Sequence, residues 1–207
     1  MATLSHPGII RIHGIGRTPN RGLFLAMDYW QRGDLQTSLQ AGQVGRNDAL
    51  RWVSEAACAI QHTHDHGVIH CDLKPSNLLL ADDGRIVVTD FGLARTLVDS
   101  SSDQIAGTPA FLAPEQLDAR WGEIGPRTDV YGLGAVLYTL LAGRPPRTGT
   151  IRDILDTITS GREPGPIGGG VPGEIAAVIQ ACLSTQPDLR PASASELAAR
   201  LDTRAKI

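Results

Sequence analysis

VIHCDLKPSN, the stretch from Val68 to Asn77, decides how the rest of this chain is interpreted. Its apolar start leads into a loop that carries a carboxylate (Asp72), an ammonium group (Lys74) and a carboxamide (Asn77). A second carboxylate, Asp90, follows a strand-like run and begins the tripeptide DFG. Each of these residue types alone is common in turns or on surfaces, so the ordered set carries the signal.

This set of side chains suits the transfer of a phosphoryl group from a nucleotide. The reaction needs in-line positioning, metal ions that bridge the phosphates, and positive charge on the migrating group. Asp72 could accept or orient the proton of an attacking hydroxyl, and Lys74 could stabilise charge on the transferred phosphate. Asn77 and Asp90 offer the oxygen ligands that Mg²⁺ prefers.

The composition of the 207-residue chain argues against several other classes of function. A formal net charge of −3 provides no basic field for nucleic acid, and 4% aromatic residues argue against a base-stacking platform. No secretory leader is visible, and the longest apolar run, Gly132 to Gly143, is too short to span a bilayer. The three cysteines predict reduced thiols, with Cys58 and Cys182 buried. We therefore expect a cytoplasmic protein with no membrane segment and no nucleic-acid partner.

Alternating and apolar runs predict two β-hairpins. The first joins Ile9–Ile15 to Leu23–Tyr29 through a loop rich in turn residues. The second joins Leu78–Leu80 to Arg85–Thr89 through an Asp-Asp-Gly turn. Two strands alone are marginal in water, so the first hairpin needs a surface to pack against.

Helical periodicity predicts most of the remaining structure. Asn47 is the expected N-cap of a long helix that stops at Gly67, and its three histidines, at positions 62, 64 and 66, are expected to be solvated rather than metal-binding. The stretch 129–142 is apolar on all sides and predicts a buried central helix. The other expected helices are residues 33–40, 151–160, 174–184 and 193–201.

The chain resembles a eukaryotic-type (Hanks-type) serine/threonine protein kinase over essentially its whole length. The stretches that carry the resemblance are VIHCDLKPSNLLL at the catalytic loop, VTDFGLA (88–94) at the metal-binding motif, GTPAFLAPE (107–115) at the end of the activation segment, DVYGLGAVLYTLLAG (129–143) at the central helix and HPGII (6–10) in the small lobe. The resemblance implies an α+β, protein-kinase-like fold. Residues 1–30 would be a remnant of the small β lobe, and residues 31–207 the large, mainly helical catalytic lobe.

The resemblance also implies an activity and a role for individual residues. The γ-phosphoryl group of ATP would pass, with the help of Mg²⁺, to a serine or threonine hydroxyl of a protein substrate. The catalytic residues would be Asp72, Lys74, Asn77 and Thr108, whose hydroxyl would bridge Asp72 and Lys74. The metal ligands would be Asn77 and Asp90. The nucleotide contacts would be Met27 at the gatekeeper position, the backbone from Asp28 to Trp30, Asp34 at the ribose, and Leu79.

Three further expectations concern contacts within the fold. Asp34 is also well placed to cap a helix, and that alternative stays open. Arg190 is expected to pair with a buried Glu115. His70 and Phe91 are expected to stack with Ile12 as an apolar spine between the lobes.

The sequence departs from the family pattern at two places. Cys71 stands where many kinases have an arginine that pairs with a phosphorylated activation loop, which predicts less dependence on such a phosphate. No Gly-rich phosphate loop occurs, and Lys74 and Lys206 are the only lysines, so none is left for the strand lysine that contacts the α and β phosphates. We expect a truncated small lobe, slower catalysis and an exposed apolar face on the first hairpin.

Two other functions are open to such a chain. One is a pseudokinase-like module that binds a partner without phosphoryl transfer, because the Gly-rich loop and strand lysine are absent. The other is a phosphotransferase for small molecules, which shares the catalytic-loop pattern. Residues 107–115 and Arg190 belong to the protein-kinase pattern and make this last function the least favoured.

Overall fold

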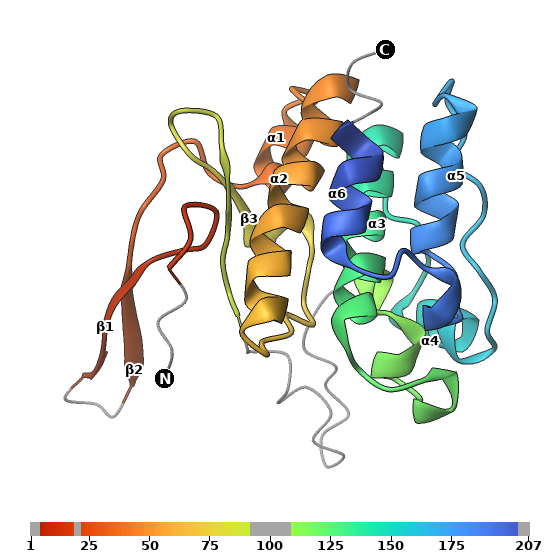
Figure 1. The fold of residues 1–207 in the computed structure, drawn as a ribbon, viewed down its shortest axis with the longest axis horizontal. Coiled ribbons are helices and arrows are strands. Elements are labelled where there is room, and N and C mark those ends of the chain that lie inside the picture. Colours follow the sequence, from red (N-terminus) through yellow and green to blue (C-terminus); the bar gives the residue numbers. More distant parts are fainter. Residues whose placement is uncertain (1–4, 19–21, 92–108, 203–207) are drawn as a thin grey trace.

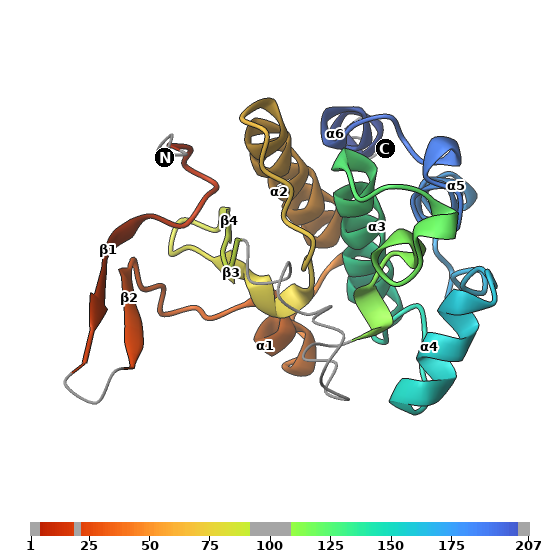
Figure 2. The ribbon, with the colours of Figure 1, turned by 90° about the horizontal axis from the view of Figure 1, so that it is seen from below.

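The computed structural model describes residues 5–18, 22–91 and 109–202. One β-hairpin projects from a helical body, and a second, shorter hairpin lies between them (Figures 1 and 2). This arrangement confirms the predicted α+β class. The main elements are β1 (Ile12–Arg17), β2 (Leu23–Met27), α1 (Leu35–Gln40), α2 (Arg46–Asp65), β3 (Leu78–Leu80), β4 (Ile86–Val88), α3 (Pro126–Ala142), α4 (Ile151–Thr159), α5 (Gly173–Cys182) and α6 (Ala194–Asp202).

Helix α3 is the centre of the helical body. Its residues from Thr128 to Leu140 are all buried, as its all-round apolar sequence predicts, and α2, α5 and α6 pack around it (Figure 2). Gly134 permits close approach to α5, because a Cβ at this position would lie 2.3 Å from Cys182 Cβ. The helix ends at Gly143, which adopts the left-handed conformation with a φ of 70°.

Helix α2 begins earlier than the sequence predicts. Gly45, and not Asn47, occupies the N-cap position, so that expectation is wrong. The backbone of Gly45 is extended, and its carbonyl already accepts the Ala49 N–H at 3.0 Å, which starts the helical ladder. At the other end Gly67 has a φ of 74°, as expected for the residue that stops a helix.

The histidines of α2 lie in two different environments. The ring centroids of His62 and His66 are 4.4 Å apart. His6, which precedes β1, stacks on His62 with ring centroids 5.0 Å apart. Burial, and then the charge of His62, lower the pKa of His6. The side chain of His64 is only 4% exposed, so the expectation of a solvated residue is wrong there. Among the described residues, no group of histidine, cysteine or acidic side chains has the geometry of a metal site.

The β1–β2 hairpin exposes its apolar side chains, as predicted. Its strands are antiparallel, with Ile15 opposite Leu25, and pack against no other sheet among the described residues. The exposed fractions run from 38% to 72% for Ile12, Ile15, Leu23, Phe24, Leu25 and Met27. The strand starts later than expected because Ile9 instead forms a bridge with Val88 of β4.

The cysteines do not share one environment. Cys182 is fully buried, and burial raises the pKa of its thiol to about 12. Cys58 lies on the outer side of α2 and is exposed, so the expectation that it is buried is wrong.

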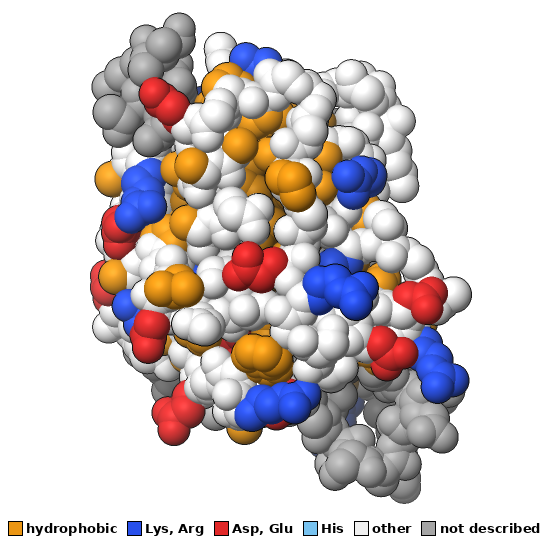
Figure 3. All heavy atoms as spheres, turned by 90° about the vertical axis from the view of Figure 1, so that its right-hand side faces the viewer, with side chains coloured by type: hydrophobic (Ala, Val, Ile, Leu, Met, Phe, Trp, Pro, Cys, Tyr) orange, Lys and Arg blue, Asp and Glu red, His pale blue; other side chains and the backbone are white. Residues whose placement is uncertain are grey.

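Two further features of the described residues are the distribution of charge on one face and the length of the helices. On the face that carries α5, the described acidic and basic side chains are interspersed among apolar atoms (Figure 3). Every helix in the described ranges is too short or too polar to cross a lipid bilayer.

Candidate active site

The loop between α2 and β3 gathers polar side chains around Asp72. Lys74 Nζ donates to Asp72 Oδ2 at 2.7 Å. Asn77 Nδ2 donates to the same oxygen at 3.0 Å and to the Asp72 carbonyl at 2.8 Å. A single 3-10 turn, Pro75–Asn77, folds the chain back so that these groups meet. The side chains of Asp72 and Lys74 keep 18% and 21% of their exposure, so the cluster remains partly open to a ligand.

A buried carboxylate on α3 fixes the start of this loop. Asp129, which is 1% exposed, accepts the N–H of His70 at 2.9 Å and of Cys71 at 2.8 Å. His64 Nε2 lies 2.7 Å from Asp129 Oδ2. This role could not be predicted from the residues alone, because an aspartate in the first turn of a helix normally indicates only a favourable helix dipole interaction.

His70 connects the Asp72 loop to the strand that precedes Asp90. Its Nε2 lies 2.8 Å from the Thr89 carbonyl, and its Nδ1 lies 3.2 Å from the Asp72 N. A carbonyl only accepts and an N–H only donates, so the His70 proton resides on Nε2. The ring is buried and holds this one tautomer, which fixes the backbone of both segments.

The short β3–β4 hairpin brings the two expected metal ligands close together. Leu78 pairs with Val88, and the Thr89 N–H donates to the Asn77 carbonyl at 3.0 Å. Asp90 is the next residue after Thr89 and has a φ of 62°, in the left-handed region that is unusual for a non-glycine residue. This conformation turns the chain sharply at the end of the strand. Such strained residues are concentrated at functional sites.

The chemistry of these two side chains fits a magnesium ion. The Asn77 amide nitrogen is used by Asp72, so the amide oxygen faces away, with Ser76 Oγ 3.5 Å from it. The Asp90 carboxylate has no hydrogen bond to any described residue and is only partly buried. Magnesium is commonly bound by one or two protein oxygen ligands together with phosphates and water, so this pair is sufficient.

Trp30 and Leu79, two of the expected nucleotide contacts, lie in one apolar cluster. Both are partly buried against Ile10 and Val87. Met27 ends β2 and is 38% exposed. The fold therefore brings these two expected nucleotide contacts together.

The segment after β2 leaves only some of its backbone groups for a ligand. The Asp28 N–H donates to the Arg11 carbonyl at 3.2 Å, and the Trp30 carbonyl accepts the Gly33 N–H at 3.3 Å. The Asp28 carbonyl, both backbone groups of Tyr29 and the Trp30 N–H make no backbone hydrogen bond to a described residue, so these groups would be left for a base. The Asp28 side chain lies 2.6 Å from His13 Nε2.

Asp34 caps helix α1. Its Oδ1 accepts the Thr37 N–H at 2.7 Å and the Thr37 hydroxyl at 2.8 Å. This confirms the capping alternative. The second carboxylate oxygen remains for another partner, and the antiparallel bridge between Asp34 and Leu79 holds the residue beside the apolar cluster.

The remaining expected contacts are met in part. The rings of His70 and Phe91 are in contact, with centroids 4.6 Å apart, but their planes are tilted by 56° and not stacked. Ile12 is 52% exposed on the projecting hairpin, where it is poorly placed to complete a buried spine. Thr108 lies outside the described residues.

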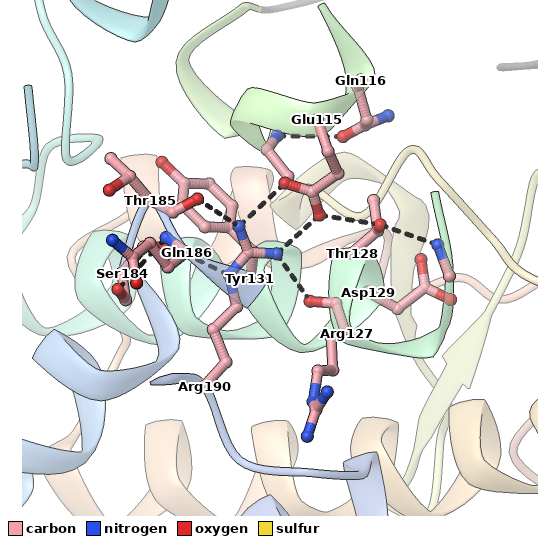
Figure 4. Close-up of polar contacts among 12 residues, drawn as sticks. Glu115, Gln116, Arg127, Thr128, Asp129, Tyr131, Ser184, Thr185, Gln186 and Arg190 are labelled. Atoms are coloured by element: carbon pink, nitrogen blue, oxygen red, sulfur yellow. Dashed lines mark hydrogen bonds and ion pairs between the residues drawn. The ribbon is translucent and has the colours of Figure 1, made fainter. Parts of the chain in front are cut away.

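The predicted pair between Arg190 and Glu115 is present and fully buried. Arg190 donates to both oxygens of Glu115, at 2.6 and 2.8 Å, and both side chains are 0% exposed (Figure 4). Thr128 Oγ1 adds a third donor to Glu115 at 2.8 Å. The guanidinium lies 4.9 Å from the ring centroid of Tyr131, and burial raises the pKa of that phenol. The turn that carries Glu115 is thereby fixed to α3.

A family model described as the protein kinase domain matches residues 1–200. The chain belongs to the protein kinase family. It is 33% identical over 212 residues to serine/threonine-protein kinase PknB of Mycolicibacterium smegmatis, an alignment that covers 97% of this chain and 34% of PknB. It is 34% identical over 212 residues to the DNA damage-responsive serine/threonine-protein kinase RqkA of Deinococcus radiodurans, with 96% of this chain and 31% of RqkA covered.

Similarity within the protein kinase family extends beyond bacteria. The chain is 33% identical over 189 residues to protein kinase C of Aspergillus fumigatus, which covers 89% of this chain and 16% of that protein. The chain spans about a third of the length of PknB and RqkA. These comparisons agree with the kinase resemblance of the sequence.

Proposed function

We propose that this chain transfers the γ-phosphoryl group of ATP to a serine or threonine hydroxyl of a protein substrate. The observation that carries the proposal is the Asp72 carboxylate, held 2.7 Å from Lys74 Nζ and 3.0 Å from Asn77 Nδ2. Asp72 would accept or orient the hydroxyl proton, and Lys74 would stabilise charge on the migrating group. In this proposal residues 1–30 belong to the small lobe and residues 31–207 to the large lobe, and the protein acts in the cytoplasm.

The same proposal assigns the cofactor contacts. Asn77 and Asp90 would hold Mg²⁺, which would offset the charge of the nucleotide phosphates. Leu79 and Trp30 would contact the base beside Met27, and the Asp34 oxygen not used in capping would accept from the ribose. The open side of the Asp72 cluster would receive the substrate hydroxyl, with Thr108 as a further catalytic residue.

The test is phosphorylation of casein by the purified chain with radiolabelled ATP and MgCl₂, followed by phosphoamino-acid analysis. We expect phosphoserine or phosphothreonine, with Asp72→Asn lowering the rate by at least about a hundredfold, because a positioned acid or base typically contributes that much. Asp82→Asn is the matched control, since Asp82 is an exposed carboxylate in the turn after β3 and should leave the rate unchanged. Equal rates for Asp72→Asn and wild type would refute the proposal.

A second candidate is a module that binds nucleotide or a partner without turnover. The observation that favours it is the projecting β1–β2 hairpin, whose apolar side chains are exposed as on interaction surfaces. A rise in melting temperature with ATP and MgCl₂, in a protein that yields no phosphoamino acid, would favour this candidate. Loss of that rise in Asp90→Asn would place the binding at the proposed metal site.

A further inference from the structure

Gln116 connects the turn that carries Glu115 to the loop that carries Asp72. Its Oε1 accepts the Ala113 N–H at 2.9 Å, and its Nε2 donates to the Cys71 carbonyl at 2.7 Å. Figure 4 shows Gln116 on this turn beside Glu115, above α3, with the bond to the backbone of its own turn. The two bonds use both ends of the side-chain amide and fix its orientation.

The carbonyl that Gln116 holds belongs to a strained residue. Cys71 has a φ of 63°, which costs about 1 kcal/mol or more for a non-glycine residue and persists only where the surroundings enforce it. Asp129 Oδ1 holds the Cys71 N–H at 2.8 Å. Gln116 holds the other end of the residue, so the backbone of Cys71 is anchored from two different elements.

The anchored peptide group is the one that leads directly into Asp72. It consists of the Cys71 carbonyl and the Asp72 N–H, which donates to His70 Nδ1 at 3.2 Å. Rotation of this peptide would swing the Asp72 carboxylate away from Lys74 and Asn77. A displacement of this kind is costly in an active site, because a misplacement of about 1 Å can lower a rate by orders of magnitude.

The turn that carries Gln116 is itself held firmly in the fold. Glu115, the preceding residue, is locked by the buried pair with Arg190, and η4, the turn Pro114–Gln116, is largely buried. The segment just before it contributes Ala110 to an apolar cluster with Ile154 and Ile158 of α4. Gln116 therefore reaches the Cys71 carbonyl from a turn that is tied to both α3 and α4.

We propose that Gln116 is a positioning residue, which sets the Asp72 carboxylate by holding the Cys71–Asp72 peptide. The proposal rests on the proposed kinase activity, in which Asp72 acts on the substrate hydroxyl. Gln116 itself touches no reacting atom, so its loss should reduce kcat and leave the KM for ATP nearly unchanged.

Two variants test this role through their dependence on pH. In Gln116→Glu, the carboxylate can still accept from Ala113 but cannot donate to the Cys71 carbonyl until it is protonated. We expect kcat relative to wild type to be lower by about tenfold at pH 8, the effect of one lost hydrogen bond, and to recover as pH falls. Gln116→Met, which lacks both bonds, should show a similar loss with no recovery. A kcat ratio for Gln116→Glu that stays near one at every pH would overturn the proposal.

Amide hydrogen exchange supplies a readout that does not depend on activity. In Gln116→Met the Asp72 amide should exchange at least about tenfold faster, while the amides of α3 keep their rates, because the two lost bonds end at Ala113 and Cys71 and neither involves α3. Equal acceleration throughout α3 would mean a purely structural role and would overturn the proposal, as would an unchanged Asp72 amide. If Asp72→Asn keeps full activity while the Asp72 amide responds as expected, the kinase function fails and the anchoring by Gln116 stands.

Discussion

Removing the guanidinium of Arg190 should destabilise the chain more than most single substitutions. Arg190→Ala leaves the Glu115 carboxylate buried without its cation, and both side chains are 0% exposed in the folded protein. The arginine also donates to the carbonyls of Ser184 at 2.9 Å and of Arg127 at 3.0 Å, which would lose a partner. Breaking a buried pair in this way costs about 3–5 kcal/mol.

The expected loss is a large part of the stability of a domain of this size. Folded domains are stable by about 5–15 kcal/mol, so Arg190→Ala should remove roughly a fifth or more of the total. The melting temperature should fall by about 6–20 °C, since each kcal/mol corresponds to about 2–4 °C in a chain of this length. Urea unfolding followed by circular dichroism measures the free energy of unfolding directly.

Two further variants decide whether the unpaired carboxylate causes the loss. Arg200→Ala removes an arginine whose pair with Glu196 is exposed, and it should cost less than about 1 kcal/mol. Adding Glu115→Gln to Arg190→Ala neutralises the buried charge and should restore about 1 kcal/mol or more. A loss below about 1 kcal/mol in Arg190→Ala, or no recovery in the double variant, would refute the reasoning.

Two other predictions concern packing and pH. Gly134→Ala should lower the free energy of unfolding by about 1–3 kcal/mol in the same urea assay, because the new Cβ would lie 2.3 Å from Cys182 Cβ. An unchanged free energy of unfolding would contradict the close packing of α3 on α5. Burial and the nearby His62 lower the pKa of His6, so the folded state binds fewer protons than the unfolded state. The stability contributed by His6 should therefore be complete above its ordinary pKa of about 6.5 and be lost as pH falls below it. Melting temperatures from pH 8 to 5 should show a smaller decline in His6→Gln than in wild type, and parallel curves would contradict this.

Local spacing in the sequence was sufficient to predict that Lys74 and Asn77 lie beside Asp72. Both residues follow Asp72 by no more than five positions, so the short separation along the chain already keeps them near it. The apolar residues of 129–142 likewise encode a helix that must be buried, whatever its neighbours are. The pairing of Glu115 with Arg190 came from the family resemblance, because these residues are 75 positions apart and nothing local connects them.

Helix ends and solvation were harder to predict from the residues. Asn47 is a better N-cap type than Gly45, but the extended backbone at Gly45 decides where α2 begins. His64 has the appearance of a solvated residue near a helix end, and only the packing of α2 against α3 brings it to Asp129. For His64 a tertiary contact outweighed the local preference, and at both positions that preference is worth less than about 2 kcal/mol.

By itself, then, the sequence determined which chemical groups the chain can present on the Asp72 loop and which helix lies at its centre. Only the tertiary structure decided how the strained backbone of Cys71 is held, with Asp129 on one end and Gln116 on the other. The physical reason is the reach of each interaction. Spacing along the chain encodes contacts over a few residues, whereas these anchors come from residues 58 and 45 positions away and meet Cys71 only once the core has formed.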